Sequence, residues 1–170
     1  ARLERTLLLL DDQPGMRVRP IMRPGKGTGE ADLEVQVERV TPVTAEVSID
    51  NHGSLTTGSN RLRGAVAFNS PFSFGDKLSI SALTTDEQMW LGSIDYERPV
   101  GAAGTRVSVG YAHTTYQLAG QFVALDARGL AKVSTVRLTH PLVRSQAANV
   151  QLSASLVHKQ LQDDFRAVGV

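Results

Sequence analysis

The sequence predicts a mainly β chain that begins with one short helix and continues as an antiparallel series of strands. Three observations predict this fold class. Apolar and polar side chains alternate in one segment after another between residues 43 and 160, which is the period of strands with one covered face. Tracts rich in Gly, Asn, Ser and Pro separate these segments. The single stretch with good helix formers is Leu-rich and precedes residue 13.

The first part of the chain is predicted to be a helix followed by a β-hairpin. Residues 3–12 (LERTLLLLDD) form the helix, and Pro14-Gly15 end it, because the residue before proline avoids the helical region and glycine accepts a positive φ. The segments 16–23 (MRVRPIMR) and 31–40 (ADLEVQVERV) alternate on either side of the turn tract PGKGTGE. This unit is predicted to end near Pro42, so residues 1–42 form one region and residues 43–170 another.

The second region predicts about seven strands in an antiparallel meander. One face of each is apolar, as in Val136, Leu138 and Leu142, and the other carries charged and small polar residues. Short turns (NSPFSFGD, ERPVGAAG, VRSQAAN) alternate with longer polar loops (NHGSLTTGSN, TTYQLAGQFVALDARG). The expected strands cover residues 43–50, 61–69, 77–82, 90–97, 106–111, 135–142 and 149–156.

The apolar face of this meander fits lipid or a protein core by its period alone. Two features favour lipid. Trp90 and Tyr96 lie at the two ends of one apolar face, about 20 Å apart at ~3.3 Å per residue, close to the spacing of the aromatic girdles of an outer-membrane barrel. Short turns opposite long loops are also typical of such barrels. A soluble β-sandwich or lipocalin-like barrel stays open as an alternative, as does a complete eight-stranded membrane barrel, which the helix and hairpin before Val43 disfavour.

Composition excludes several classes of function. Lys and Arg total 18 against 17 Asp and Glu, so no strong field draws the chain to nucleic acid. The absence of cysteine excludes disulfides, thiolate catalysis and a cysteine-bound metal. The four histidines are too widely spaced to predict a metal site, and neither a phosphate-binding loop nor a Gly-x-Ser-x-Gly elbow is present. We expect no enzymatic activity, catalytic residue, metal or cofactor.

The residue patterns of three separate stretches resemble those of the outer-membrane transporters of two-partner secretion, the haemolysin secretion/activation family. Residues 50–80 are similar to the first barrel hairpins of that family, residues 5–38 to the latter half of a POTRA domain, and residues 140–164 to a strand-turn-strand of the barrel. The motif residues in the first stretch are Asp50, Asn51, Gly53, Thr57, Gly58, Arg61, Asn69, Pro71, Gly75 and Asp76, and those in the third are Pro141, Arg144 and Asn149.

The resemblance implies a partial chain of a pore that captures a large secreted exoprotein in extended form and exports it through the outer membrane. Residues 1–42 would be the C-terminal half of a periplasmic POTRA domain, and residues 43–170 the N-terminal portion of a transmembrane β-barrel in contact with lipid. The resemblance implies a barrel of about sixteen strands, which would need roughly 300 residues. Residues 43–170 supply only about seven strands, which leaves an open sheet with unpaired edges. The isolated piece is therefore expected to require detergent, self-association or a different fold. The family's gating residues have no counterpart among residues 1–170.

Two sets of candidate site residues follow from this resemblance. An exposed POTRA strand is implied to add an extended exoprotein segment by main-chain hydrogen bonding, and Arg17, Arg19, Ile21 and Arg23 are its candidate residues, although arginines there also suit a solvated strand face. The register of the strands places a second set inside the barrel, where pairing across strands is the expected role for most. These lumen-facing residues are Glu46, Asp50, Arg61, Arg63, Asp95, Glu97, Arg106 and Arg137.

Overall fold

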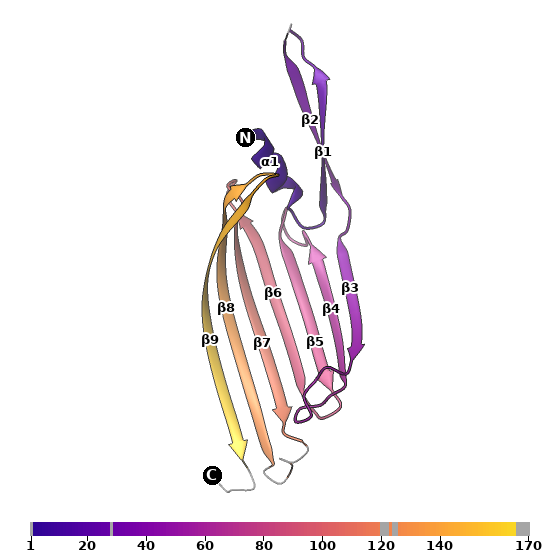
Figure 1. Cartoon of the computed structure of the whole chain (residues 1–170), viewed down its shortest axis with the longest axis vertical. Coiled ribbons are helices and arrows are strands. Elements are labelled where there is room, and N and C mark those ends of the chain that lie inside the picture. The colour runs from indigo at the N-terminus through magenta and orange to yellow at the C-terminus, as the bar shows by residue number, and fades with distance from the viewer. Residues whose placement is uncertain (1, 28, 120–122, 124–125, 166–170) are drawn as a thin grey trace.

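The computed structural model describes residues 2–27, 29–119, 123 and 126–165, and shows one helix, one β-hairpin and one long antiparallel sheet (Figure 1). Helix α1 spans Arg2–Asp11, and the hairpin consists of β1 (Met16–Pro24) and β2 (Ala31–Arg39). The sheet follows chain order from β3 to β9, which confirms the predicted meander. Its strands are β3 (Val43–Asp50), β4 (Arg61–Asn69), β5 (Lys77–Thr85), β6 (Trp90–Val100), β7 (Thr105–Gln117), β8 (Ala127–Arg144) and β9 (Asn149–Phe165).

The last four strands are longer than the sequence predicts. Residues 114–117, 127–129 and 143–144 were expected in loops or turns, and the structure places them in β7 and β8. The turn expected at residues 97–104 is likewise shorter, because β6 continues to Val100. The prediction failed there because the backbone ladder continues where the apolar alternation ends, for example where Tyr116 pairs with Gly129.

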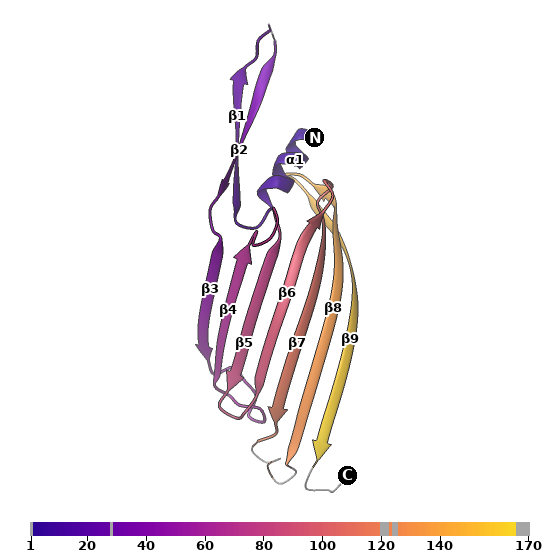
Figure 2. The same cartoon turned by 180° about the vertical axis from the view of Figure 1, so that it is seen from behind.

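The long sheet is a single layer, and Figures 1 and 2 show no described helix or second sheet on either of its faces. The hydrophobic residues buried in the described part of the chain are Leu83, Ala119 and Ala127. The accessible surface is 11461 Å², whereas a compact monomer of 18.3 kDa exposes about 8,100 Å². A soluble sandwich would need a second layer over the apolar face, so the described residues do not form one.

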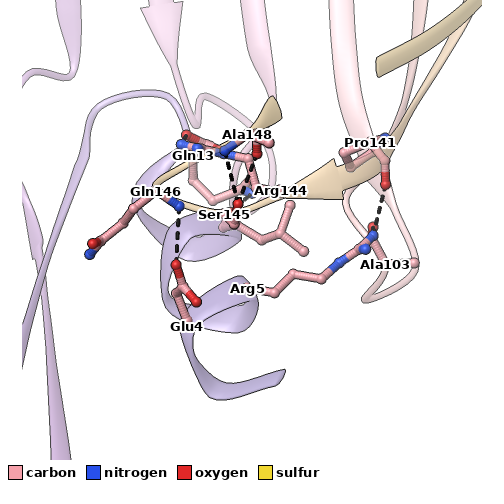
Figure 3. A network of polar contacts seen from close by, with 11 residues as sticks. Glu4, Arg5, Gln13, Ala103, Pro141, Arg144, Ser145, Gln146 and Ala148 are labelled. Carbon is pink, nitrogen blue, oxygen red and sulfur yellow. Dashed lines mark hydrogen bonds and ion pairs between the residues drawn. The ribbon is translucent and has the colours of Figure 1, made fainter. Parts of the chain in front are cut away.

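Helix α1 is fastened to the end of the sheet where β8 turns into β9 (Figure 3). The Arg5 guanidinium donates to the carbonyl oxygens of Pro141 at 2.8 Å and Leu142 at 3.1 Å. At the β8–β9 turn, the backbone N–H of Gln146 donates to Glu4 Oε1 at 3.0 Å. These contacts join residues more than 130 positions apart, so α1 belongs to the rim of the sheet as well as to the hairpin.

A β-bulge in β8 provides part of this attachment. The pairing of β8 with β9 shifts register between Pro141 and Val143, where proline has no N–H for the ladder. Leu142 therefore has no partner in the ladder, and Val143 takes the place opposite Val150 that an unbroken alternation would have given to Leu142. The shift also exchanges the faces of the residues that follow. Arg144 thereby reaches Asp12 and donates two hydrogen bonds to its carboxylate, each 2.7 Å long.

Two turn glycines let the region of α1 approach the sheet closely. Gly104, at φ 82°, lies in the β6–β7 turn, and a Cβ there would stand 2.5 Å from Leu9 Cδ2. Gly75, at φ 77° before β5, faces the Gln13 side chain in the same way. Larger residues at these positions would collide with α1 or with the residue that follows it closely, in addition to being strained.

We expect Gly104→Ala to loosen α1 more than Gly101→Ala does. Both glycines have positive φ, but no described atom lies within 4 Å of the Cβ that alanine would add at residue 101. Both variants share a backbone strain of about 1–2 kcal/mol, and at residue 104 the Leu9 side chain and the Pro141 ring must also shift to make room for the Cβ. The readout is bismaleimide cross-linking between Glu4→Cys and Gln146→Cys. Equal yields in the two alanine backgrounds would contradict the close contact of Leu9 with Gly104.

The turn between β4 and β5 is organised by a fully buried aspartate. Asp76 is 0% exposed, and its Oδ2 accepts hydrogen bonds from Tyr96 Oη at 2.7 Å, the Ser73 N–H at 2.9 Å and Ser73 Oγ at 3.1 Å. Oδ1 is buried without a hydrogen-bond partner among the described residues. Burial acts to raise the pKa of Asp76, but the hydrogen bonds from Tyr96 and Ser73 outweigh it and hold the pKa below its usual value.

The lowered pKa of Asp76 predicts a pH-dependent contribution to stability. A depressed folded-state pKa stabilises the protein above the unfolded value, ~3.9, and this stabilisation is lost as the pH falls through the folded pKa. We expect Asp76→Asn to lower the thermal midpoint at pH 7 and to differ less from the parent protein near pH 3, as measured by circular dichroism in detergent. Asp86→Asn, at an exposed loop hydrogen-bonded to Asn60, is the control. A pH-independent difference would refute the assignment.

Candidate functional site

One face of the long sheet carries all eight residues that the sequence predicted to face a lumen. The ladder aligns Asp50 with Arg61, and Glu97 with Arg137 through Ser108. The remaining four occupy positions of the same parity in β3, β4, β6 and β7. The structure therefore brings the set onto one surface, the polar face of the sheet.

Half of these residues form ion pairs with each other. Arg61 Nε lies 2.7 Å from Asp50 Oδ1, which closes the ends of β3 and β4 around the 51–60 loop. The Arg106 guanidinium pairs with Glu97. Within the described residues, Glu46, Arg63, Asp95 and Arg137 have no ion pair inside 4 Å. Charged side chains without a direct ion-pair partner thus remain on this polar face.

Arg106 connects the polar face to the segment after α1. Besides Glu97, its guanidinium donates to Gln13 Oε1 at 3.2 Å and to the Gly75 carbonyl oxygen at 2.8 Å. It therefore ties together β6, β7, the β4–β5 turn and the C-terminal side of α1.

A cavity of about 500 Å³ lies between α1 and the near end of the polar face. Leu9, Asp12 and Gln13 form its wall on the helix side. The sheet contributes the charged residues Glu97, Arg106, Arg137 and Arg144, together with uncharged side chains such as Thr139, Gln151 and Ser153. Its volume is within the usual range of ligand-binding clefts.

The four candidate exoprotein-binding residues lie on one face of β1. Arg17, Arg19, Ile21 and Arg23 alternate with Val18, Pro20 and Met22. Arg23 Nε lies 2.7 Å from Glu34 Oε2, and Arg19 Nη2 lies 4.0 Å from Glu38 Oε2 on β2. Both pairs are largely exposed to solvent, so each contributes only about 0–1 kcal/mol.

The outer edge of β1 offers few hydrogen-bond donors. The N–H groups of Met16 and Val18 point away from β2 and bond to the Gln13 carbonyl and to Asp11 Oδ1. By the alternation of an antiparallel pair, Pro20, Met22 and Pro24 point the same way, and proline has no N–H. Met22 therefore keeps the free donor on this part of β1. The outer edge of β2, in contrast, contains no proline.

The opposite face of the long sheet is apolar and exposed. Val47 is 74% and Leu156 is 75% exposed. Trp90 packs over Gly92 and its ring centroid lies 5.9 Å from that of His113. Tyr96, expected as the second aromatic of a girdle, lies on this face but uses its hydroxyl to hold Asp76.

The apolar residues form a band that crosses the sheet obliquely. They run from Val43 to Ile49 on β3 and from Val150 to Leu156 on β9, with midpoints at Glu46 and Ser153. The ladder row through Glu46, however, reaches β9 at Lys159. Along β9, Lys159 and Ser153 are about 20 Å apart, and across the sheet β3 and β9 are about 29 Å apart. This slope corresponds to a strand tilt of about 35°, within the range of membrane β-barrels.

Charged residues that share a ladder row with apolar ones support the same tilt. Lys132 on β8 lies in the row of Val47, and Arg98 on β6 lies in the row of Leu138. All four point to the apolar face. An untilted sheet would hold each charge at the depth of its apolar row partner, whereas a tilt moves Lys132 and Arg98 beyond opposite edges of the band.

Sequence reasoning missed the residues that join α1 to the sheet, namely Arg5, Asp12, Gln13 and Arg144 as an ion-pair partner. Pro141 inside a predicted strand was an available signal, because proline within a sheet often marks a bulge. The pairing of Asp12 with Arg144 depends on that bulge and on the position of α1, neither of which leaves a local pattern.

The described residues contain neither a metal-binding cluster nor a membrane-spanning helix. No group of three or more His, Cys, Asp and Glu side chains could hold a metal ion. Within residues 2–27, 29–119, 123 and 126–165, the only helix is α1, which is not long and apolar enough to cross a membrane.

Comparison with known proteins identifies the architecture. The chain is 29% identical to the heme/hemopexin transporter protein HuxB of Haemophilus influenzae (strain 86-028NP), over 99% of the chain and 30% of the relative. It is 27% identical to the outer membrane transporter CdiB of Escherichia coli, over 91% of the chain and 29% of the relative. The chain therefore spans about 30% of the length of these relatives.

Solved structures show the same fold. CdiB from Escherichia coli matches 92% of the chain and 30% of its own length with a TM-score of 0.72 at 23% identity. CdiB from Acinetobacter baumannii matches 92% of the chain and 31% of its own length with a TM-score of 0.67 at 21% identity. The family model of the haemolysin secretion/activation proteins ShlB/FhaC/HecB matches residues 29–167. With more than half of its residues under that model, the chain belongs to the haemolysin secretion/activation family.

Proposed function

We propose that the chain is part of an outer-membrane transporter that exports a partner exoprotein in extended form. Residues 43–170 would form the first seven strands of the barrel, and residues 1–42 the C-terminal half of a periplasmic POTRA domain. The observation that carries the proposal is the oblique apolar band on a single-layered sheet. The similarity to HuxB and CdiB, both transporters, supports it and disfavours a self-contained soluble or adhesive domain.

The polar face would line the lumen of this pore. In a membrane barrel, successive residues of each strand point alternately to the lipid and to the lumen, so one face of the sheet contacts lipid and the other contacts water. A charge such as Arg63 or Arg137 at the lipid midplane would cost about 2–4 kcal/mol, so the charged residues of the polar face require the aqueous side. Nothing in this role needs a cofactor or an enzymatic step.

The end of the sheet that carries α1 would face the periplasm. Two of the three connections at the opposite end, residues 51–60 and 118–126, are longer than the turns 101–104 and 145–148 beside α1. Outer-membrane barrels have short periplasmic turns and long extracellular loops. This orientation places the hairpin where an exoprotein would arrive.

The hairpin would capture the exoprotein along β1. An added strand would donate to the outward carbonyl groups of β1, and Arg17 together with the weakly paired Arg19 and Arg23 could turn to exoprotein carboxylates. The side chain of Ile21 lies among these arginines on the same face and adds an apolar contact.

Fractionation of the full-length transporter tests the main proposal. We expect the protein in the outer membrane, with a gel mobility that changes on heating, as a folded barrel gives. A soluble full-length protein without this change would overturn the proposal.

Cysteine labelling tests the lipid contact and the tilt together, because residues 1–170 contain no cysteine. In an otherwise cysteine-free transporter, we expect a water-soluble maleimide to label Lys132→Cys in intact membranes and to leave Val47→Cys unlabelled until detergent is added. These residues share a ladder row and a face, so only their depth differs. Equal labelling of the two before detergent would contradict a tilted sheet in lipid.

Proline substitution tests capture along β1. Met22→Pro removes the free donor of the β1 edge, whereas Val35→Pro removes an outward donor of β2 at a comparable edge position. We expect Met22→Pro to weaken binding of the partner exoprotein several-fold, in line with the loss of one hydrogen bond of about 1 kcal/mol, and Val35→Pro to have less effect. Binding is measured by co-purification with the full-length transporter. The reverse order would assign capture to the β2 edge.

A further inference from the structure

The cavity beneath α1 contains one arginine that lacks a direct partner. Arg106 is occupied by Glu97, Gln13 and the Gly75 carbonyl, and Arg144 by Asp12. Among the described residues, Arg137 makes no hydrogen bond and no ion pair within 4 Å. The lining thus holds three arginines against Asp12 and Glu97.

An acidic residue outside the lining, Asp95, also interacts with Arg137. Its carboxylate lies over Gly110, and it interacts electrostatically with Arg137. Asp95 is not among the residues that line the cavity. Asp95 shares a ladder row with Thr135, so it lies toward the middle of β8 from Arg137, whereas the cavity lies on the side toward α1.

Uncharged polar groups surround Arg137 on the cavity side. Thr139 lies two residues along β8, and its hydroxyl lies 3.3 Å from Ser153 Oγ on β9. Gln151 and Asn149 continue the lining toward α1. Such amides and hydroxyls can both donate and accept hydrogen bonds, which suits a peptide backbone, and arginine binds carboxylates in a two-bonded geometry.

We propose that this cavity is a carboxylate-binding subsite, in which Arg137 holds the acidic side chain of an extended polypeptide that passes beneath α1. The subsite rests on the proposed transport function, because an extended polypeptide would reach it while moving between the hairpin and the lumen. Selection of acidic side chains at this point would slow or orient the polypeptide as it enters the pore.

Current block in planar lipid bilayers tests the subsite on the full-length transporter. The probes are a flexible Gly/Ser peptide with one Glu and the same peptide with Gln, added on the α1 side. We expect the Glu peptide to dwell roughly tenfold longer in the wild-type pore, as a charged hydrogen bond implies. Arg137→Gln should bring the ratio of dwell times near one, and Arg137→Lys should keep part of the preference.

Arg63→Gln is the matched control. Arg63 also lies on the polar face and has no ion pair among the described residues, but it is outside the cavity. We expect this variant to retain the preference for the Glu peptide. An equal loss in both variants would show a general lumenal field and overturn the subsite, as would a wild-type pore without preference. Heat-dependent gel mobility confirms that each variant is folded.

Two further measurements distinguish a polypeptide site from a small-anion site, and failure of the subsite from failure of the transport proposal. If free glutarate occupies the site as tightly as the Glu peptide does, the site takes small anions and the assignment to a polypeptide is wrong. Open-pore conductance without peptide tests the transport proposal by itself. A protein that forms no pore overturns both proposals, whereas a conducting pore without peptide preference overturns the subsite alone.

Discussion

The register of the backbone ladder is the constraint on which the rest of this structure depends. Successive residues point to opposite faces, so a slip of one residue in any strand would exchange its charged and apolar sides. Residues at the strand ends hold the register in place. Asp50 and Arg61 pair across the ends of β3 and β4, Asn69 Nδ2 donates to the Thr41 carbonyl, and Asp76 closes the β4–β5 turn. Asp50, Arg61, Asn69 and Asp76 are among the residues on which the resemblance to the family rests. In the structure their contacts join the strand ends and so help to fix which face each strand presents.

The bulge in β8 shifts the pairing register between β8 and β9, and it lies where the sheet meets α1. By interrupting the ladder at Pro141, it leaves carbonyl oxygens to which Arg5 donates, and by exchanging faces it brings Arg144 to Asp12. A regular strand would have sent Arg144 to the apolar face. One irregularity thus supplies two attachments, and the helix is held by groups that the sheet itself does not use.

The sequence was sufficient where local pattern and tertiary environment agree. The strands β3 and β4 were predicted at their observed bounds because alternation and turn residues mark the same limits, and the parity of all eight polar-face residues followed from that alternation. The ends of β7, β8 and β9 were missed because, beyond the apolar band, polar residues and glycines lie on both faces and leave no period. The cavity could not be predicted at all, since it depends on a helix near residue 9 meeting strands near residues 106, 137 and 151.

The tilt of the strands and the position of α1 are related. On β9 the apolar band begins at Val150, directly after the turn to which α1 is attached, whereas polar residues continue beyond its other end at Leu156. The turn that binds Glu4 and the bulge that binds Arg5 therefore lie at the edge of the band. Asp12 and Gln13 reach the polar face and not the apolar one. In the proposed membrane orientation, α1 would sit at the surface of the lipid and beside the aqueous opening, so that a polypeptide leaving the hairpin meets the cavity before it meets the rest of the polar face.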